Sequence, residues 1–206
     1  MAHAQHCTLD QHSHATGTMI DVPGGQKLVE DLQVGDLVRT KDNGYQSIRW
    51  IASRTLSAAD FAADKSLRPI RIKAGALGEA KPSRDLKVSQ QHCVLLDDWR
   101  CELLFGQDEV LAPASALLND STVTIDRSDR DVTYYHFMFD HHEIVYSNGV
   151  ETESFHPAFA GVEALDEAKR EELFKLFPEL EQNADAYGET ARTTLKDYEV
   201  DVLMAC

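Results

Sequence analysis

Short stretches of alternating apolar and polar residues, each ended by a turn, fill most of the first 155 residues. Such alternation puts successive side chains on opposite faces of an extended chain, so each stretch predicts a half-buried β-strand. Turn-forming residues lie between them, as in Asp42-Asn43-Gly44 and Asn148-Gly149. The predicted strands are 18–22, 34–40, 46–51, 69–72, 86–88, 93–96, 110–112, 123–125, 133–139 and 143–146. The pattern predicts a mostly β domain.

The pattern changes after Phe155, where apolar residues recur at helical spacing. Asp166 is placed to cap the first predicted helix, and Pro178 ends it. A second predicted helix follows, with Leu195, Tyr198, Val202 and Leu203 on one face. The first sixteen residues are polar, rich in histidine and without periodicity, which is typical of a flexible leader.

Composition excludes several classes of function. Lys and Arg number 20 against 35 Asp and Glu, a net charge of −15, which argues against a nucleic-acid partner because binding to phosphates needs a basic surface. No apolar run approaches the length of a membrane span, so we expect no membrane partner. No signal peptide is visible, and the four cysteines lack C-x-x-C spacing, which favours a reduced compartment. Localisation stays open between the cytoplasm and export by a non-classical route.

Several motifs occur in an order that resembles the Hint (Hedgehog/intein) superfamily, most closely its bacterial Hedgehog/intein-type domains. Ser13 lies four residues before Gly17 of a Gly-Thr pair, where that family has the cysteine or serine that opens the domain. The later matches are Val29–Val38 (Val-x-x-Leu-x-x-Gly-Asp-x-Val), Ser89 with His92, Tyr135-His136, and Asn148-Gly149. The resemblance implies a Hint β-fold over residues 13–155, preceded by a leader at 1–12 and followed by a helical extension at 156–206.

The resemblance also implies a reaction. The Ser13 side chain attacks the carbonyl of His12, an N-to-O acyl shift that turns the amide into an ester. An acid must protonate the departing amine, and His92 fits because an imidazole exchanges protons near neutral pH. Ser89 is expected to hydrogen-bond the substrate backbone or to orient His92.

Two further histidines are candidates for the same site. His136 takes the place usually held by Asp in inteins, and is expected to activate the nucleophile or a second attacker. His142 is a further candidate for this pocket. The partners are then the chain's own leader as substrate in cis, and water or a small nucleophile as acyl acceptor. No cofactor or metal is expected for this reaction.

Three departures from the family pattern limit the reaction. Serine is a poorer nucleophile than cysteine, so Ser13 is either a native, slow nucleophile or an engineered replacement of cysteine; the attached leader favours the second reading. Inteins end in a His-Asn pair, which is absent here, and Asn148 before Gly149 is typical of a turn. We therefore expect N-terminal cleavage or acyl transfer without splicing. No acidic residue follows Trp50 where Hedgehog proteins have the Asp that activates sterol.

Alternatives of other classes stay open. The leader and its border carry His3, His6, Cys7, His12 and His14, which could bind Zn²⁺, Ni²⁺ or Cu²⁺. The chain could also be a catalytically inactive Hint-like binding module whose helical tail docks a partner. Cys93 beside His92 could be a reactive thiol, although the alternation around it predicts a buried small apolar residue.

Overall fold

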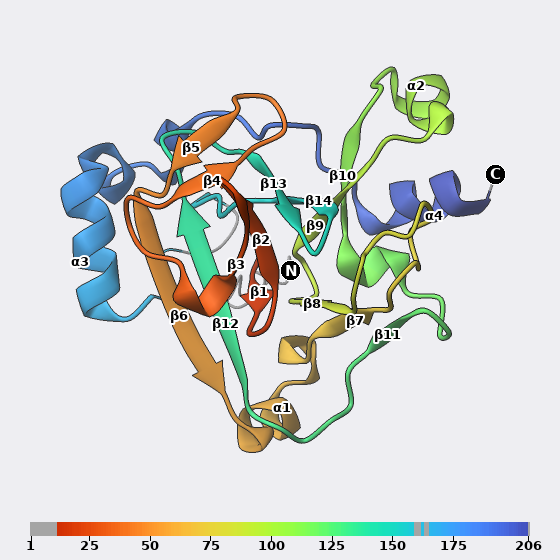
Figure 1. The fold of residues 1–206 in the computed structure, drawn as a ribbon, viewed down its shortest axis with the longest axis horizontal. Coiled ribbons are helices and arrows are strands. Elements are labelled where there is room, and N and C mark those ends of the chain that lie inside the picture. The colour runs from red at the N-terminus through yellow and green to blue at the C-terminus, as the bar shows by residue number, and fades with distance from the viewer. Residues whose placement is uncertain (1–11, 159–161, 163–164, 206) are drawn as a thin grey trace, which may run out of the picture.

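Two six-stranded β-sheets and a two-stranded ribbon form the body of the computed structural model, which describes residues 12–158, 162 and 165–205 (Figure 1). The first sheet has the order β11-β7-β8-β1-β12-β6 and the second the order β10-β9-β14-β13-β2-β3. The ribbon pairs β4 with β5. All named strand pairs in these sheets are antiparallel, as expected for strands joined by turns. The prediction of a mostly β domain is confirmed.

The strands of the first sheet are β11 (Val123–Ile125), β7 (Ile70–Ile72), β8 (Leu86–Val88), β1 (His14–Ala15), β12 (Val132–Met138) and β6 (Trp50–Leu56). Those of the second are β10 (Val110–Pro113), β9 (Cys93–Leu96), β14 (Val150–Glu153), β13 (Ile144–Ser147), β2 (Met19–Val22) and β3 (Gly25–Leu28). The ribbon consists of β4 (Leu37–Arg39) and β5 (Tyr45–Ser47). The helices are α1 (Ala58–Ala63), α2 (Trp99–Phe105), α3 (Glu167–Leu176) and α4 (Asp197–Ala205).

Several elements differ from the sequence prediction. The predicted strand 46–51 is two strands, β5 and β6, and β6 continues to Leu56. The predicted strand 34–40 is shortened to β4 because Gly35 has a positive φ of 93° and belongs to the preceding turn. Helices α1 and α2 and strands β1, β3 and β14 were not predicted. Strand β1 lies within the first sixteen residues, so the expectation of a flexible leader is wrong for residues 13–16, which pair with β8 and β12 and are largely buried. The two helices are only 6 and 7 residues long, too short to show a clear helical period.

The turn at Asn148-Gly149 is confirmed. Asn148 has a φ of 51° and Gly149 a φ of 83°, the left-handed conformation that both residues tolerate, and the turn joins β13 to β14. The Asn148 side chain accepts a hydrogen bond from the Met19 amide (2.8 Å) and donates one to the Asp85 carbonyl (3.1 Å). Asn148 is therefore a structural turn residue.

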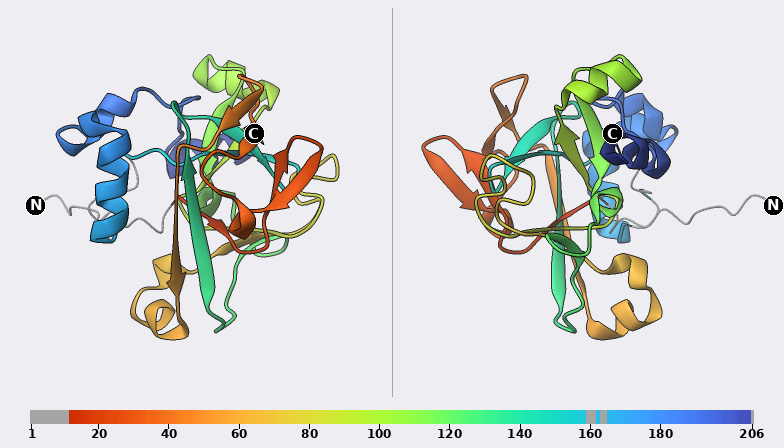
Figure 2. Two further views of the ribbon diagram at one scale, coloured as in Figure 1. Left: turned by 60° about the vertical axis from the view of Figure 1, so that its left-hand side comes forward. Right: turned by 90° about the vertical axis from the view of Figure 1, so that its right-hand side faces the viewer.

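The helical tail packs on the β body. Helix α3 begins after Asp166, whose side chain accepts a hydrogen bond from the Lys169 amide, and it ends before Pro178, both as predicted. Leu173 of α3 shares a buried cluster with Trp50 and Phe155 of the β body. Figure 2 shows α3 on one side of the long β6–β12 ladder and the β2–β3 hairpin on the other. Leu203 of α4 belongs to a second buried cluster with Val94 and Val110. Both helices of the tail therefore contribute apolar side chains to hydrophobic clusters of the β body.

In the described part of the chain, no helix combines the length and the apolar character needed to cross a membrane.

Candidate active site

Ser13 lies at the centre of the first sheet, between two neighbouring strands. β1 pairs with β12 in the register His14↔Tyr135 and with β8 in the register His14↔Val88. One residue further along both registers, Ser13 lies opposite His136 on one side and Ser89 on the other. Three residues distant in sequence meet at the His12–Ser13 peptide, and all three are fully buried or nearly so.

Ser89 holds the backbone of Ser13. Its hydroxyl accepts a hydrogen bond from the Ser13 amide at 2.7 Å, and its own amide donates to the Ser13 carbonyl at 3.0 Å. The nitrogen of the His12–Ser13 peptide bond therefore has a fixed position and a hydroxyl group beside it. A contact to the Ser13 backbone corresponds to one of the two roles expected for Ser89.

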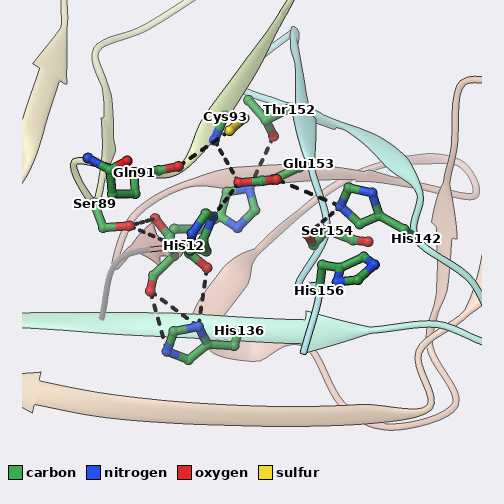
Figure 3. A network of polar contacts seen from close by, with 12 residues as sticks. His12, Ser89, Gln91, Cys93, His136, His142, Thr152, Glu153, Ser154 and His156 are labelled. Atoms are coloured by element: carbon green, nitrogen blue, oxygen red, sulfur yellow. Dashed lines mark hydrogen bonds and ion pairs between the residues drawn. The ribbon is translucent and has the colours of Figure 1, made fainter. Parts of the chain in front are cut away.

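His136 contacts both the Ser13 hydroxyl and the His12 carbonyl oxygen. Its Nδ1 lies 3.2 Å from Ser13 Oγ and 3.2 Å from the carbonyl oxygen of His12, and its Nε2 lies 3.3 Å from Ser13 Oγ (Figure 3). Burial lowers the pKa of His136 to about 3, although the His12 carbonyl favours the charged ring. The imidazole is thus neutral at pH 7, with one nitrogen able to donate a proton and the other able to accept one.

The imidazole ring of His92 is buried. Among the described residues neither of its ring nitrogens has a hydrogen-bond partner, and its ring packs edge-on against His14 at 4.3 Å between centroids. Burial lowers the pKa of His92 to about 4, although the nearby charge of Glu153 opposes this shift. The Ser13 amide donates its hydrogen bond to Ser89 and not to His92. Proton transfer from His92 to the Ser13 nitrogen therefore stays a prediction.

His142 lies behind the site, away from Ser13. Its Nδ1 accepts a hydrogen bond from the Ala191 amide (3.0 Å), so the proton is on Nε2, which donates to the Ser154 carbonyl (3.1 Å). Nε2 is also 3.7 Å from a carboxylate oxygen of Glu153. The described contacts of His142 therefore reach the site through Glu153.

Glu153 is the site residue that sequence reasoning missed. Its buried carboxylate lies 2.9 Å from His12 Nδ1 and accepts a hydrogen bond from the Cys93 amide at 2.7 Å (Figure 3). Burial alone would raise the pKa of Glu153, but His12 opposes this most, followed by His92 and His142, and the result is a pKa of about 2. The only signal in the sequence is an acidic residue flanked by Thr152 and Ser154, which looks like an ordinary edge of a strand.

Cys93 is an unreactive thiol in this setting. It is 1% exposed, and its Sγ donates to the Gln91 carbonyl at 3.4 Å. Burial raises the pKa of Cys93 well above its usual value, and the negative charge of Glu153 adds to the effect. The structure therefore agrees with the buried apolar reading of this residue.

Two of the five leader and border residues of the metal alternative fall in the described part of the chain. His14 is buried, and its Nε2 contacts Ser147 Oγ (2.8 Å) and Thr152 Oγ1 (3.2 Å). His12 faces Glu153. His3, His6 and Cys7 lie outside the described residues.

A family profile described as "Hint domain" matches residues 12–159. The chain belongs to the Hint domain family. The match spans every candidate residue of the Ser13 site, and the mostly β body with C-terminal helices has the fold expected of a bacterial intein-like Hint domain.

Comparison with solved structures gives neighbours for this Hint domain at low sequence identity. An intein-like domain from Clostridium thermocellum has 12% identity and a TM-score of 0.43, over 70% of this chain and 99% of that one. The gp41-1 intein has 15% identity and a TM-score of 0.42, over 68% and 96%. A splice-inactive variant of the AceL NrdHF class 3 split intein has 12% identity and a TM-score of 0.46, over 69% and 97%. The search of curated proteins gave no match.

Proposed function

We propose that this Hint domain processes itself at the His12–Ser13 bond, by an N-to-O acyl shift followed by cleavage or acyl transfer without splicing. The observation that carries the proposal is the position of His136, whose ring contacts both the Ser13 hydroxyl and the His12 carbonyl oxygen. Hint domains are self-processing in general, and the family match covers this bond.

In the first step, Ser13 Oγ bonds to the carbonyl carbon of His12. The proton of the hydroxyl passes to His136 Nε2, while Nδ1–H donates to the carbonyl oxygen as negative charge develops there. A single neutral imidazole thus serves as base and as oxyanion donor. Its depressed pKa keeps it in the form that both roles need.

In the second step, the bond between the His12 carbonyl carbon and the Ser13 nitrogen breaks. The nitrogen takes up one proton and leaves as an amine, and the acyl group stays on Ser13 Oγ as an ester. The Ser89 hydroxyl beside this nitrogen orients it for protonation. We assign the acid role to His92, which would take up the proton that His136 removed from Ser13 and pass it to this nitrogen once the site rearranges. Its ring nitrogens have no hydrogen-bond partner among the described residues, which leaves them able to accept and donate a proton.

In the last step, water or an added nucleophile attacks the ester. Water gives residues 1–12 with a free carboxylate and residues 13–206 with a free α-amine. Asn148 lies in a turn with both ends of its side chain hydrogen-bonded, which supports cleavage without the asparagine cyclisation of splicing.

Intact-mass measurement with and without hydroxylamine tests the proposal. We expect hydroxylamine to release residues 1–12 as the hydroxamate and leave residues 13–206, and we expect Ser13→Ala to stay whole. A wild-type chain that keeps its full mass after a day with hydroxylamine would contradict self-processing and favour the inactive binding module.

A further inference from the structure

The side chain of His12, the last residue of the leader, is held against the β body. Its Nδ1 lies 2.9 Å from Glu153 Oε1, and the two side chains are only 13% and 4% exposed (Figure 3). We propose that Glu153 forms a recognition subsite for the side chain of the residue before Ser13, which accepts an N–H donor and rejects an acidic group. This inference deepens the proposed function and rests on it, because the subsite would select the leader that the domain cleaves.

The chemistry of the contact defines what the subsite accepts. Burial alone would raise the pKa of Glu153, but His12 and two further histidines lower it to about 2, so the group is ionised at neutral pH. A carboxylate only accepts hydrogen bonds, so His12 Nδ1 carries the proton and donates it. An apolar side chain at position 12 would leave the buried charge without this donor, and a second carboxylate would repel it.

The β body holds the Glu153 carboxylate by contacts of its own. The Cys93 amide donates to Oε1 at 2.7 Å, and the other oxygen lies 3.7 Å from His142 Nε2. The helical tail contributes as well, because the Ala191 amide donates to His142 Nδ1 at 3.0 Å. A binding group whose position is fixed by supporting contacts discriminates between side chains more sharply than a mobile one.

No permanent cation pairs with this carboxylate among the described residues. The ion pairs found there for Glu153 are with His12 and His142, and none is with lysine or arginine. Burial lowers the pKa of His142 to about 4, so its ring is neutral at pH 7. The leader therefore supplies an important partner of the buried charge. A buried group that is built to bind a donor rejects a side chain that lacks one, because the group is then left unpaired.

The subsite also holds residue 12 in position for attack. His136 Nδ1 lies 3.2 Å from the His12 carbonyl oxygen, while Glu153 holds the imidazole. With its backbone and its side chain both held, residue 12 keeps its carbonyl beside Ser13 Oγ, and such positioning lowers the barrier to attack. A side chain that does not fit the subsite must turn away from Glu153 and loosen the carbonyl. We therefore expect the identity of residue 12 to control the rate of the acyl shift.

Substitutions at position 12 test the subsite. Glutamine and glutamate have the same shape and differ in one group, an amide that donates hydrogen bonds or a carboxylate that only accepts them. With hydroxylamine, we expect His12→Gln to release residues 1–12 at least about 30-fold faster than His12→Glu, with His12→Leu between them. Intact mass over time measures each rate. Equal rates for His12→Gln and His12→Glu would overturn the subsite.

The gap between these two variants should depend on Glu153. Glu153→Gln keeps an oxygen for the Cys93 amide and removes the negative charge, so the ratio of the two rates should shrink at least about tenfold. Glu151→Gln is the matched control, because it removes another carboxylate of β14, which pairs with Lys81 at 3.1 Å, and it should leave the ratio unchanged. The same ratio in Glu153→Gln as in the wild type would contradict recognition by Glu153.

Melting curves show whether each variant folds. If Glu153→Gln does not fold, the series at position 12 still decides the proposal, since it leaves the β body unchanged.

Urea denaturation of a chain that cannot cleave itself separates the subsite from the reaction. In the Ser13→Ala chain, His12→Leu and Glu153→Gln are combined in a double-mutant cycle. We expect the two changes to be coupled by at least about threefold in the equilibrium constant for unfolding. Effects that simply multiply overturn the subsite. A wild-type chain that releases nothing with hydroxylamine contradicts the proposed function, while this cycle still decides the subsite.

Discussion

Ser13 and His136 face each other across the β1–β12 pair, with Ser13 Oγ 3.2 Å from His136 Nδ1. The same ring nitrogen lies 3.2 Å from the carbonyl oxygen that Ser13 would attack. One side chain on one strand therefore contacts both the Ser13 hydroxyl and the His12 carbonyl, and strand register fixes this geometry.

Removal of the His136 imidazole should slow cleavage. His136→Ala takes away both the base and the oxyanion donor, so we expect the hydroxylamine-induced rate to fall by a factor of about 100 or more. His141→Ala removes an exposed histidine near the following turn and should leave the rate unchanged. Intact mass over time measures both. Equal rates for the two variants would remove His136 from the reaction.

Replacement of the nucleophile by cysteine should speed the reaction with thiols. Ser13→Cys supplies a side chain that forms its reactive anion far more readily than serine does near pH 7. We expect at least about tenfold faster release of residues 1–12 with a strong thiol. Ser13→Ala is the control and should release nothing. If Ser13→Cys loses no leader within a day, self-processing is wrong.

The buried imidazole of His92 should lower the free energy of unfolding, although the proposed reaction needs it. Both ring nitrogens are buried without partners among the described residues, so His92→Leu should raise the free energy of unfolding by about 1 kcal/mol. Cleavage should be abolished, as in His92→Ala, if His92 is the acid. Urea denaturation and intact mass measure the two effects.

His14→Leu is the matched control for this effect. The His14 ring is equally buried but hydrogen-bonded to Ser147 and Thr152, so replacing it with leucine should lower the free energy of unfolding.

The acid role of His92 has its own test. If His92→Ala cleaves at the normal rate, His92 is not the acid, even though the domain is active.

Acid should destabilise the fold at a pH where ordinary carboxylates are still charged. Burial lowers the pKa of His92 and His142 to about 4, below the value of about 6.5 for an unfolded chain. Between these values the unfolded chain binds protons that the folded chain does not, so the free energy of unfolding falls as the pH falls. Each such histidine contributes a slope of up to about 1.4 kcal/mol per pH unit.

Urea denaturation with chelator at several pH values between about 7 and about 4.5 measures this slope. His92→Leu removes one of the groups and should flatten the curve. A stability that is constant over the window, or a variant as steep as the wild type, would contradict the neutral burial of these rings.

The sequence by itself determined the elements that depend on neighbouring residues. Alternation predicted β12 and β9, the Asn148-Gly149 turn followed from residues that tolerate a positive φ, and Asp166 with Pro178 set the ends of α3. The order of the motifs indicated the family. The strand, turn and helix-end signals lie within a few residues of the features they predict, whereas the order of the motifs extends from Ser13 to Gly149.

Only the tertiary structure decided which side chains meet at the His12–Ser13 bond. Glu153 reaches His12 across 141 positions of sequence, and the β9–β14 register, which no local pattern specifies, puts it beside Cys93. His142 was a candidate because it is a histidine close to His136 in the sequence, yet its hydrogen bonds turn its ring toward Ser154 and Ala191. Local propensity sets strands and turns, whereas contacts between distant strands depend on register and on burial in the shared core.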